Sequence, residues 1–276
     1  MARPSNPLKI PSKRVAITVS LAGHPELTPD EETSLRHLRH YLGHYDRYVI
    51  APKSMDVPHD DFQVVRFGDE YFGSANAQTR LMMKPEYYET FSDYEYVLTY
   101  QLDALALSDQ LLQWCSAGFD FIGAPNYGLS DRLSTVCSGG FALRKVSSFL
   151  KVLYSDRYSV DPDQYWRALT AGKSPLTKLR NAPRKYWKRL HRFNGIDREI
   201  KWFLDGRGVL LEDEFFVHNA ARFYPDFKVP TVETALRFAF DETPRVAFEM
   251  TKGQLPFGAH AWYKQDRQFY EPYLLR

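Results

Sequence analysis

Two acidic positions of this chain follow hydrophobic segments, where a carboxylate can bind or move charge. Asp103 comes directly after the apolar run 96–102, whose Val97, Leu98 and Tyr100 favour a covered β-strand. An acid at the carboxyl end of a central strand lies where open α/β sheets bind their ligands. The alternative for Asp103 is that it only caps a turn.

Three consecutive acids, Glu212, Asp213 and Glu214, stand inside an apolar segment that runs from Leu210 to Phe223. At helical spacing both Asp213 and Glu212 share a face with apolar residues of this segment. We therefore expect at least one of the two carboxylates to point into the protein, although the periodicity does not choose between them. A buried carboxylate is a candidate general base. The alternative is a surface helix start decorated with acids.

Paired glycines and a late histidine are the other notable residues. Gly139 and Gly140 open an apolar segment that ends at Arg144, and they allow a ligand or another strand to approach closely. A tight strand bulge is the alternative. His260 lies just before Trp262 in an apolar segment, where a histidine can be a ligand or a hydrogen-bonded structural residue.

The elements expected around these residues alternate between strand and helix. Strands are predicted at 15–21, 48–51, 62–67, 96–102, 119–125 and 138–144, and helices at 30–41, 77–91, 110–117 and 212–223. The helix at 77–91 is expected to break near Lys84 and Pro85. This order predicts a Rossmann-like α/β layer. Neither a Gly-x-Gly-x-x-Gly fingerprint nor a Walker A sequence is present, so dinucleotide and P-loop chemistry are not expected.

A basic insertion interrupts the second half of the chain at about 156–206. Between positions 173 and 192 there are eight Lys or Arg residues and no acid, with Tyr186, Trp187, Leu190 and Phe193 interleaved. We expect a basic amphipathic helix that lies on an anionic membrane surface, through residues 173–193, or binds an anionic acceptor. A solvated basic face is the commoner outcome for such a segment.

The composition limits the classes of binding partner and the compartment that we expect. The 276 residues are 44% hydrophobic and carry a formal net charge of +2, so no global field favours nucleic acid. Cys115 and Cys137 form neither a metal motif nor a disulfide framework, which favours a reducing, cytoplasmic compartment. Residues 1–13 are expected to be flexible and lack the apolar core of a signal peptide.

Five segments in this order resemble the domain-of-unknown-function 5672 family, glycosyltransferases of GT-A type associated with microbial surface polysaccharides. The segments are 101–105, 121–125, 138–144, 212–216 and 256–262. The likeness covers about residues 14–265 apart from the basic insertion. It implies a GT-A-like, Rossmann-type mixed sheet flanked by helices in a single domain, with a nucleotide-binding half at 14–125 and an acceptor half at 126–276.

The resemblance implies an inverting transfer of a sugar from a nucleotide diphosphate, with UDP favoured, to a hydroxyl of a glycan or lipid-linked acceptor. Asp213 would be the base, and Glu212 or Glu214 would hold acceptor hydroxyls. Asp103 and His260 would bind Mn²⁺ or Mg²⁺. Gln101 stands where the family's metal motif has its first acid, so the metal would have one carboxylate fewer.

The same resemblance gives expectations for the nucleotide and the sugar. Thr18 and Ser20 would meet the base or ribose, Arg80 and Lys84 the diphosphate, and Gln101 a ribose or phosphate. Gly139 and Gly140 would lie under the donor sugar or acceptor, and Trp262 would stack on a sugar face or pack in the core.

Two other functions remain open from the sequence. A nucleotidyltransferase shares this type of nucleotide-binding layer, but the chain lacks a Gly-rich loop with Arg and Lys after the first strand. A catalytically silent module would instead dock on an anionic membrane or polymer through the basic insertion. The expected location is the cytoplasm, or the inner face of the membrane as a peripheral protein.

Overall fold

A mixed six-stranded sheet organises the molecule, and we describe it from a computed structural model. The structure describes residues 10–20, 26–57, 61–126, 135–206 and 211–275. The strand order is β3-β2-β1-β4-β7-β6. The strands are β1 Lys13–Ser20, β2 Asp46–Pro52, β3 Gln63–Phe67, β4 Tyr94–Gln101, β6 Phe121–Asn126 and β7 Thr135–Lys145. Strands β1 to β4 are parallel, whereas β7 runs antiparallel to both of its neighbours.

The antiparallel direction of β7 decides what meets at the carboxyl edge of the sheet. Tyr100 of β4 pairs with Phe141 of β7, so the glycines just before Phe141 lie beside the end of β4. The pairing of β6 with β7 shifts register between Ile122 and Pro125. Such an irregularity re-aims residues of a strand. The first half of β7 and the last residues of β4 therefore share one edge.

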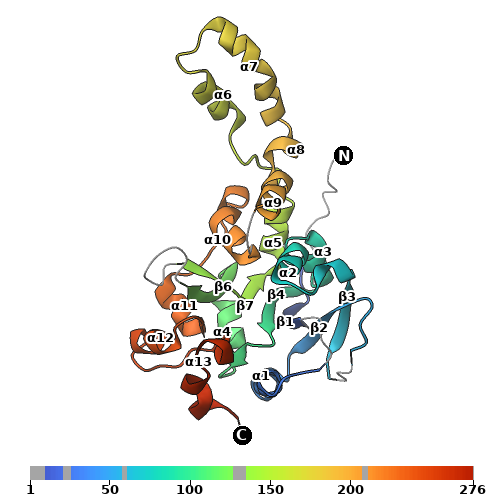
Figure 1. The fold of residues 1–276 in the computed structure, drawn as a ribbon, viewed down its shortest axis with the longest axis vertical. Coiled ribbons are helices and arrows are strands. Elements are labelled where there is room, and N and C mark those ends of the chain that lie inside the picture. The colour runs from blue at the N-terminus through green and yellow to red at the C-terminus, as the bar shows by residue number, and fades with distance from the viewer. Residues whose placement is uncertain (1–9, 21–25, 58–60, 127–134, 207–210, 276) are drawn as a thin grey trace.

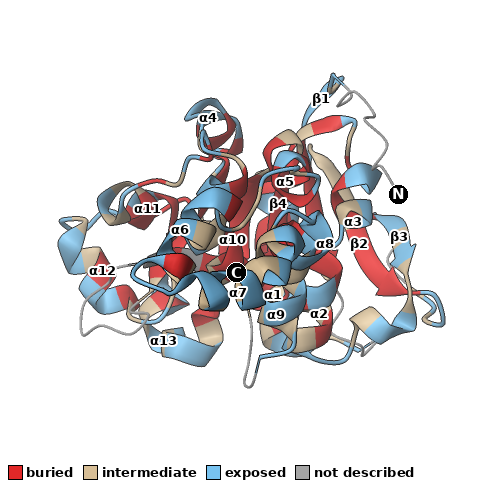
Figure 2. Ribbon diagram, turned by 90° about the horizontal axis from the view of Figure 1, so that it is seen from above, coloured by how far each residue is buried: buried red, intermediate tan, exposed pale blue. Residues whose placement is uncertain are grey.

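Helices cover both faces of the sheet, and the buried residues concentrate on the strands between them (Figure 2). One face packs against α1, α4 and α11, and the other against α2, α3, α5 and α10. Their bounds are α1 Pro29–Leu42, α2 Ala75–Met82, α3 Pro85–Thr90, α4 Leu111–Ser116, α5 Val146–Leu153, α10 Glu212–Phe223 and α11 Val232–Phe238. A short 3-10 helix, Asp69–Tyr71, precedes α2.

A second, three-stranded sheet of short strands, in the order β5-β9-β8, lies beside the carboxyl edge. It is built from β5 Leu105–Ala106, β8 Ala239–Phe240 and β9 Gly258–Ala259. Because β5 follows Asp103 and β9 precedes His260, their pairing holds these two residues close together. The helices α12 Pro244–Met250 and α13 Trp262–Tyr270 and the 3-10 helix Glu271–Tyr273 complete this part of the chain.

The basic insertion forms a helical hairpin that extends from one end of the molecule (Figure 1). Its helices are α6 Pro162–Thr170, α7 Pro175–Lys188, α8 His191–Asn194 and α9 Ile196–Leu204. The side chains of Asp161 and Ser174 cap α6 and α7 by accepting hydrogen bonds from backbone N–H groups of the first turn. Local capping thus defines both helices of the hairpin.

Residues 262–275 fasten onto α1. The indole Nε1 of Trp262 donates to Ser34 Oγ at 2.8 Å, and the backbone N–H of Leu275 donates to His37 Nε2 at 2.9 Å. The other ring nitrogen of His37, Nδ1, lies 2.8 Å from the carbonyl oxygen of Ala106. Burial lowers the pKa of His37, so the ring is neutral and Nδ1 is its donor.

The α/β architecture expected from the sequence is confirmed, including the helix break at Lys84 and Pro85. The strands β5, β8 and β9 and the helices α5 and α11 to α13 were not predicted. Among the described residues, no helix has both the length and the apolar character needed to cross a membrane.

Candidate active site at the carboxyl edge of the sheet

Several of the predicted functional residues lie directly beside Gly139 and Gly140. A Cβ atom built on Gly139 would lie 2.7 Å from Asp213 Oδ2 and 3.2 Å from Glu212 Oε1. A Cβ atom on Gly140 would overlap the His260 ring and lie 2.8 Å from Gln101 Oε1. Only glycine therefore fits at either position without moving these side chains.

The two adjacent glycines have the acid pair on one side of β7 and His260 on the other, because successive Cβ atoms of a strand point to opposite faces. Successive Cα atoms are 3.8 Å apart, so Asp213 and His260 approach within about 12 Å of each other. Asp103 lies 3.5 Å from His260, measured from Oδ1 to Nε2. Segments around 103, 213 and 260 thus converge at the carboxyl edge, which is where open α/β sheets bind ligands.

A fully buried arginine stands behind the acid pair. Arg144 Nη2 donates to Glu212 Oε1 at 2.7 Å, and its Nη1 donates to Thr99 Oγ1 and, at 3.4 Å, to the carbonyl of Gly139. The other oxygen of Glu212 accepts from Thr79 Oγ1 at 3.4 Å. Arg144 was not selected from the sequence as a site residue. The feature that could have indicated it is its position as a lone arginine in an apolar strand. Glu212 is an anion held by this arginine.

Asp213 has one carboxylate oxygen that accepts no hydrogen bond from the described residues. Its Oδ1 accepts the backbone N–H of Glu214 at 2.8 Å, whereas no donor within the described residues reaches Oδ2. Burial, reinforced by the charge of Glu212 and opposed by that of Arg144, raises the pKa of Asp213 to about 8. Both acids of the pair are buried, which exceeds the expectation that at least one would be. A carboxylate with a raised pKa can take a proton near neutral pH.

His260 is held through both ring nitrogens. Its Nδ1 lies 3.0 Å from Asp241 Oδ2 and 3.1 Å from Ser138 Oγ, and its Nε2 lies 3.1 Å from Gln101 Oε1. Burial opposes a charged ring, but the hydrogen bond and charge of Asp241, with the charge of Asp103, outweigh it and raise the pKa of His260. The His260 ring thus lies between two carboxylates that favour its protonated form.

The predicted metal ligands, Asp103 and His260, are engaged in ion pairs. Lys264 Nζ donates to Asp103 Oδ2 at 2.8 Å, so an ammonium group stands where a cation would sit. The carboxylates of Asp103 and Asp241 approach opposite nitrogens of His260 and do not converge on one point. No group of three or more His, Cys, Asp or Glu side chains suited to a metal ion is found in the described part of the chain. These residues, as arranged, do not fit a divalent cation.

Three further predicted residues differ in how accessible they are. Ser20 pairs with Gln101 at the carboxyl edge and is partly exposed, so it borders the site. Thr18 is buried, and its hydroxyl lies 3.1 Å from that of Tyr87, which leaves no free edge for a nucleotide. Trp262 is fully buried, so it packs in the core and presents no ring face to a sugar.

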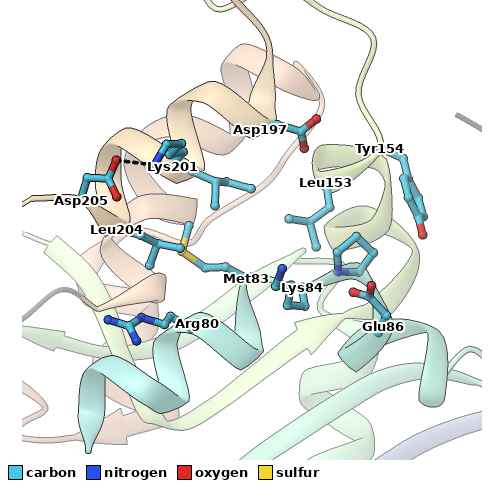
Figure 3. Close-up of a pocket in the computed structure, with 12 residues that line it drawn as sticks. Arg80, Met83, Lys84, Glu86, Leu153, Tyr154, Asp197, Lys201, Leu204 and Asp205 are labelled. Carbon is cyan, nitrogen blue, oxygen red and sulfur yellow. Dashed lines mark hydrogen bonds and ion pairs between the residues drawn. The ribbon is translucent and has the colours of Figure 1, made fainter. Parts of the chain in front are cut away.

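Arg80 and Lys84 line a separate pocket of about 690 Å³ between α2, α5 and α9 (Figure 3). Apolar side chains of Met83 and Leu204 also line it, and Lys201 pairs with Asp205 at its rim. None of Asp103, Asp213 or His260 lines this pocket. The structure thus does not bring the expected diphosphate-binding cations to the carboxyl edge.

The fold and this edge define a mixed α/β protein that has buried acids, an arginine and a histidine between two carboxylates at the ends of its central strands. The chain belongs to the DUF5672 family, described as proteins of unknown function, because the family model matches residues 61–260. A search of curated proteins found no match. The match covers β4, β7, the helical hairpin and the edge residues from Gln101 to His260, and it leaves out Ser20 and Lys264.

Proposed function

We propose that this protein is an inverting glycosyltransferase of GT-A type that uses a nucleotide-diphosphate sugar. The observation that carries the proposal is that Asp213 lies against Gly139, while His260, with Asp103 3.5 Å from its ring, lies against the adjacent Gly140 at the carboxyl edge. A general base, a pair of positive groups and a backbone stretch without side chains are the parts that sugar transfer needs in one place. The resemblance noted in the sequence supports the same assignment.

Asp213 Oδ2 is the proposed base. The hydroxyl oxygen of the acceptor forms a bond to the anomeric carbon of the donor while the bond from that carbon to the diphosphate breaks. The hydroxyl proton passes to Asp213, and the nucleoside diphosphate leaves with the electron pair. The raised pKa of Asp213 favours this proton transfer, because a general base is most effective when its pKa lies near the working pH. Glu212, held by Arg144, and Glu214 would orient acceptor hydroxyls.

Lys264 and His260 are the proposed partners of the departing diphosphate. The Lys264 side chain is 60% exposed, so its ammonium group can turn from Asp103 to a bound phosphate. The hydrogen bond and charge of Asp241 raise the pKa of His260 and so favour its protonated form. Gln101 and Ser20, paired at the strand ends, offer hydrogen bonds to ribose or phosphate. This mechanism has no step that depends on Mn²⁺ or Mg²⁺.

The test is a screen of nucleotide sugars for hydrolysis in the absence of acceptor, with and without Mn²⁺ and with EDTA. We expect slow release of UDP or another nucleoside diphosphate by the wild type and its loss in Asp213→Asn. The exposed Asp226 provides the matched control, since Asp226→Asn removes a carboxylate outside the site. Lys264→Met should weaken nucleotide binding measured by thermal shift.

Three results would contradict the proposal. Stabilisation by no nucleotide at all would favour a catalytically silent binding module. Release of pyrophosphate from a nucleoside triphosphate and a sugar phosphate would indicate a nucleotidyltransferase. Hydrolysis that survives Asp213→Asn would exclude that residue as the base.

A further inference from the structure

The outward face of α7 is a row of exposed apolar side chains. Leu176 and Leu179 near its start are 80% and 72% exposed, and Tyr186 and Trp187 near its end are more than half exposed, as is Leu190, which follows α7 and precedes α8. We call these five residues the α7 stripe. At about 100° of rotation per residue, the four that belong to α7 fall within about 100° of one another, on one face of the helix. No residue of α7 is buried.

Contacts on the opposite side of α7 fix which face is outward. Lys185 Nζ lies 5.6 Å from the centre of the Trp166 ring of α6. Arg189 Nη2 pairs with Asp163 Oδ1 at 2.8 Å. These cationic residues therefore turn toward α6, so the stripe turns away from it. A helix usually does the reverse and buries its apolar face.

The charge around the stripe has one sign. No acid occurs between positions 173 and 192, where there are eight Lys or Arg residues. Arg180 follows Leu176 by four residues and Arg184 precedes Trp187 by three, so both border the stripe. Both arginines are exposed. The apolar face is thus edged by cations that remain in water.

We propose that the α7 stripe docks this protein on the surface of an anionic lipid bilayer. Leu side chains would enter the acyl boundary, Trp187 and Tyr186 would sit at the headgroup level, and Arg180 and Arg184 would meet lipid phosphates. The 14 residues of α7 give a helix about 21 Å long, shorter than the hydrocarbon core of about 30 Å, so the helix lies in the interface. The hairpin extends beyond the body, which leaves this face open to a flat surface (Figure 1).

Charge argues against a second copy of this chain as the occupant. Two copies of α7 packed stripe to stripe would bring their bordering arginines together, and like charges oppose such a contact. A bilayer containing acidic lipids offers both the apolar phase and the opposite charge. This inference does not depend on the proposed glycosyltransferase activity.

The test is co-sedimentation of the full chain with vesicles of phosphatidylcholine alone and with about 30% phosphatidylserine. We expect binding to the acidic vesicles only, and its decrease at high salt. The pair Leu176→Ser with Leu179→Ser should weaken binding at least tenfold, because their apolar surface no longer enters lipid. The pair Arg180→Gln with Arg184→Gln should weaken it roughly 30-fold, since each cation near an acidic surface strengthens binding about fivefold.

Leu112 is the matched control. It is an exposed leucine, 49% accessible, on α4 of the body, so Leu112→Ser should bind vesicles as the wild type does. The proposal is overturned if the wild type does not bind acidic vesicles, or if the leucine pair binds them unchanged. Self-association that is lost in the leucine pair, without vesicle binding, would identify a second copy as the occupant. Failure of nucleotide-sugar hydrolysis would leave the vesicle result unaffected.

Discussion

The carboxyl edge and the helical hairpin distribute charge in opposite ways. At the edge, Arg144, Glu212 and Asp213 are all buried. In the hairpin, Arg180 and Arg184 are exposed, and so are Leu176 and Trp187. Each arrangement costs free energy, because ions lose hydration inside the protein and apolar surface stays in water outside it.

This difference in how charge is buried or exposed suits the carboxyl edge and the helical hairpin to different roles. A buried ion pair contributes little net stability, but it fixes the position of a charge to within a fraction of an ångström. An exposed apolar row contributes nothing to the isolated fold, but it gains when another phase covers it. The edge therefore suits chemistry on a small substrate, and the hairpin suits contact with a large surface. Substitutions in the two regions should differ accordingly.

The largest stability effect is expected for Arg144→Met. Without the guanidinium, the buried carboxylate of Glu212 keeps Thr79 as its one hydrogen-bond donor among the described residues, which should cost about 3–5 kcal/mol in the free energy of unfolding. Urea unfolding measures this loss. Adding Glu212→Gln to the variant removes the stranded charge and should recover part of the loss. A cost below about 1 kcal/mol would show that the ion pair of Arg144 and Glu212 does not stabilise the carboxyl edge.

Asp213→Asn should raise stability at alkaline pH and abolish donor hydrolysis. The pKa of Asp213 is raised from 3.8 to about 8, so the folded protein holds this proton more tightly than the unfolded chain does. Its contribution is present at low pH and is lost as the pH rises through about 8. Above that pH the variant should exceed the wild type by up to a few kcal/mol. Urea unfolding at several pH values tests this, and equal pH slopes in the two proteins would contradict it.

Gly140→Ala should cost about 1–3 kcal/mol and abolish hydrolysis, because the new methyl group displaces His260. Gly172, in the hairpin, is the control. Its φ of 63° favours glycine but nothing lies within 4 Å of an added Cβ atom, so Gly172→Ala should cost about 1 kcal/mol and keep activity. Thermal unfolding and the hydrolysis assay measure both effects. Equal activity of the two variants would remove Gly140 from the site.

The smallest stability effect is expected for the leucine pair of the α7 stripe. Because Leu176 and Leu179 contact water, their replacement by serine should change the free energy of unfolding by less than about 0.5 kcal/mol. Urea unfolding of this variant is also the folding control for the vesicle assay. A large loss of stability would mean that the stripe packs against the protein and does not face solvent.

Periodicity and capping in the sequence were enough for the main elements. The strand before Asp103, the broken helix at Lys84 and the helix that begins at Glu212 are local patterns, and the structure confirms each of them. The strands β5, β8 and β9 have only two residues each, and their pairing depends on partners far along the chain. No local signal marks such strands.

Residues of the candidate site could be predicted where the residue type itself indicates a role, as for glycine or an acid in an apolar segment. They were missed where the role comes from a contact with another residue. The two glycines and the acid pair were selected from the sequence. Lys264 and Asp241 were not selected, because only a contact made in the folded protein distinguishes them. Lys264 contacts Asp103, 161 positions earlier, and Asp241 contacts His260, 19 positions later. Trp262 was offered as a sugar-stacking residue, whereas its hydrogen bond to Ser34 places it in the core.

The attachment of residues 262–275 to α1 has a consequence for how this protein is made. Ser34 leaves the ribosome 228 residues before Trp262, its hydrogen-bond partner, and His37 precedes Leu275 by 238 residues. At ordinary rates of translation, that interval lasts roughly 10–50 s. Throughout this time the inner side of α1, with Leu35 and Leu38, lacks part of the chain that later covers it, and such exposed apolar surface is a target for chaperones during synthesis.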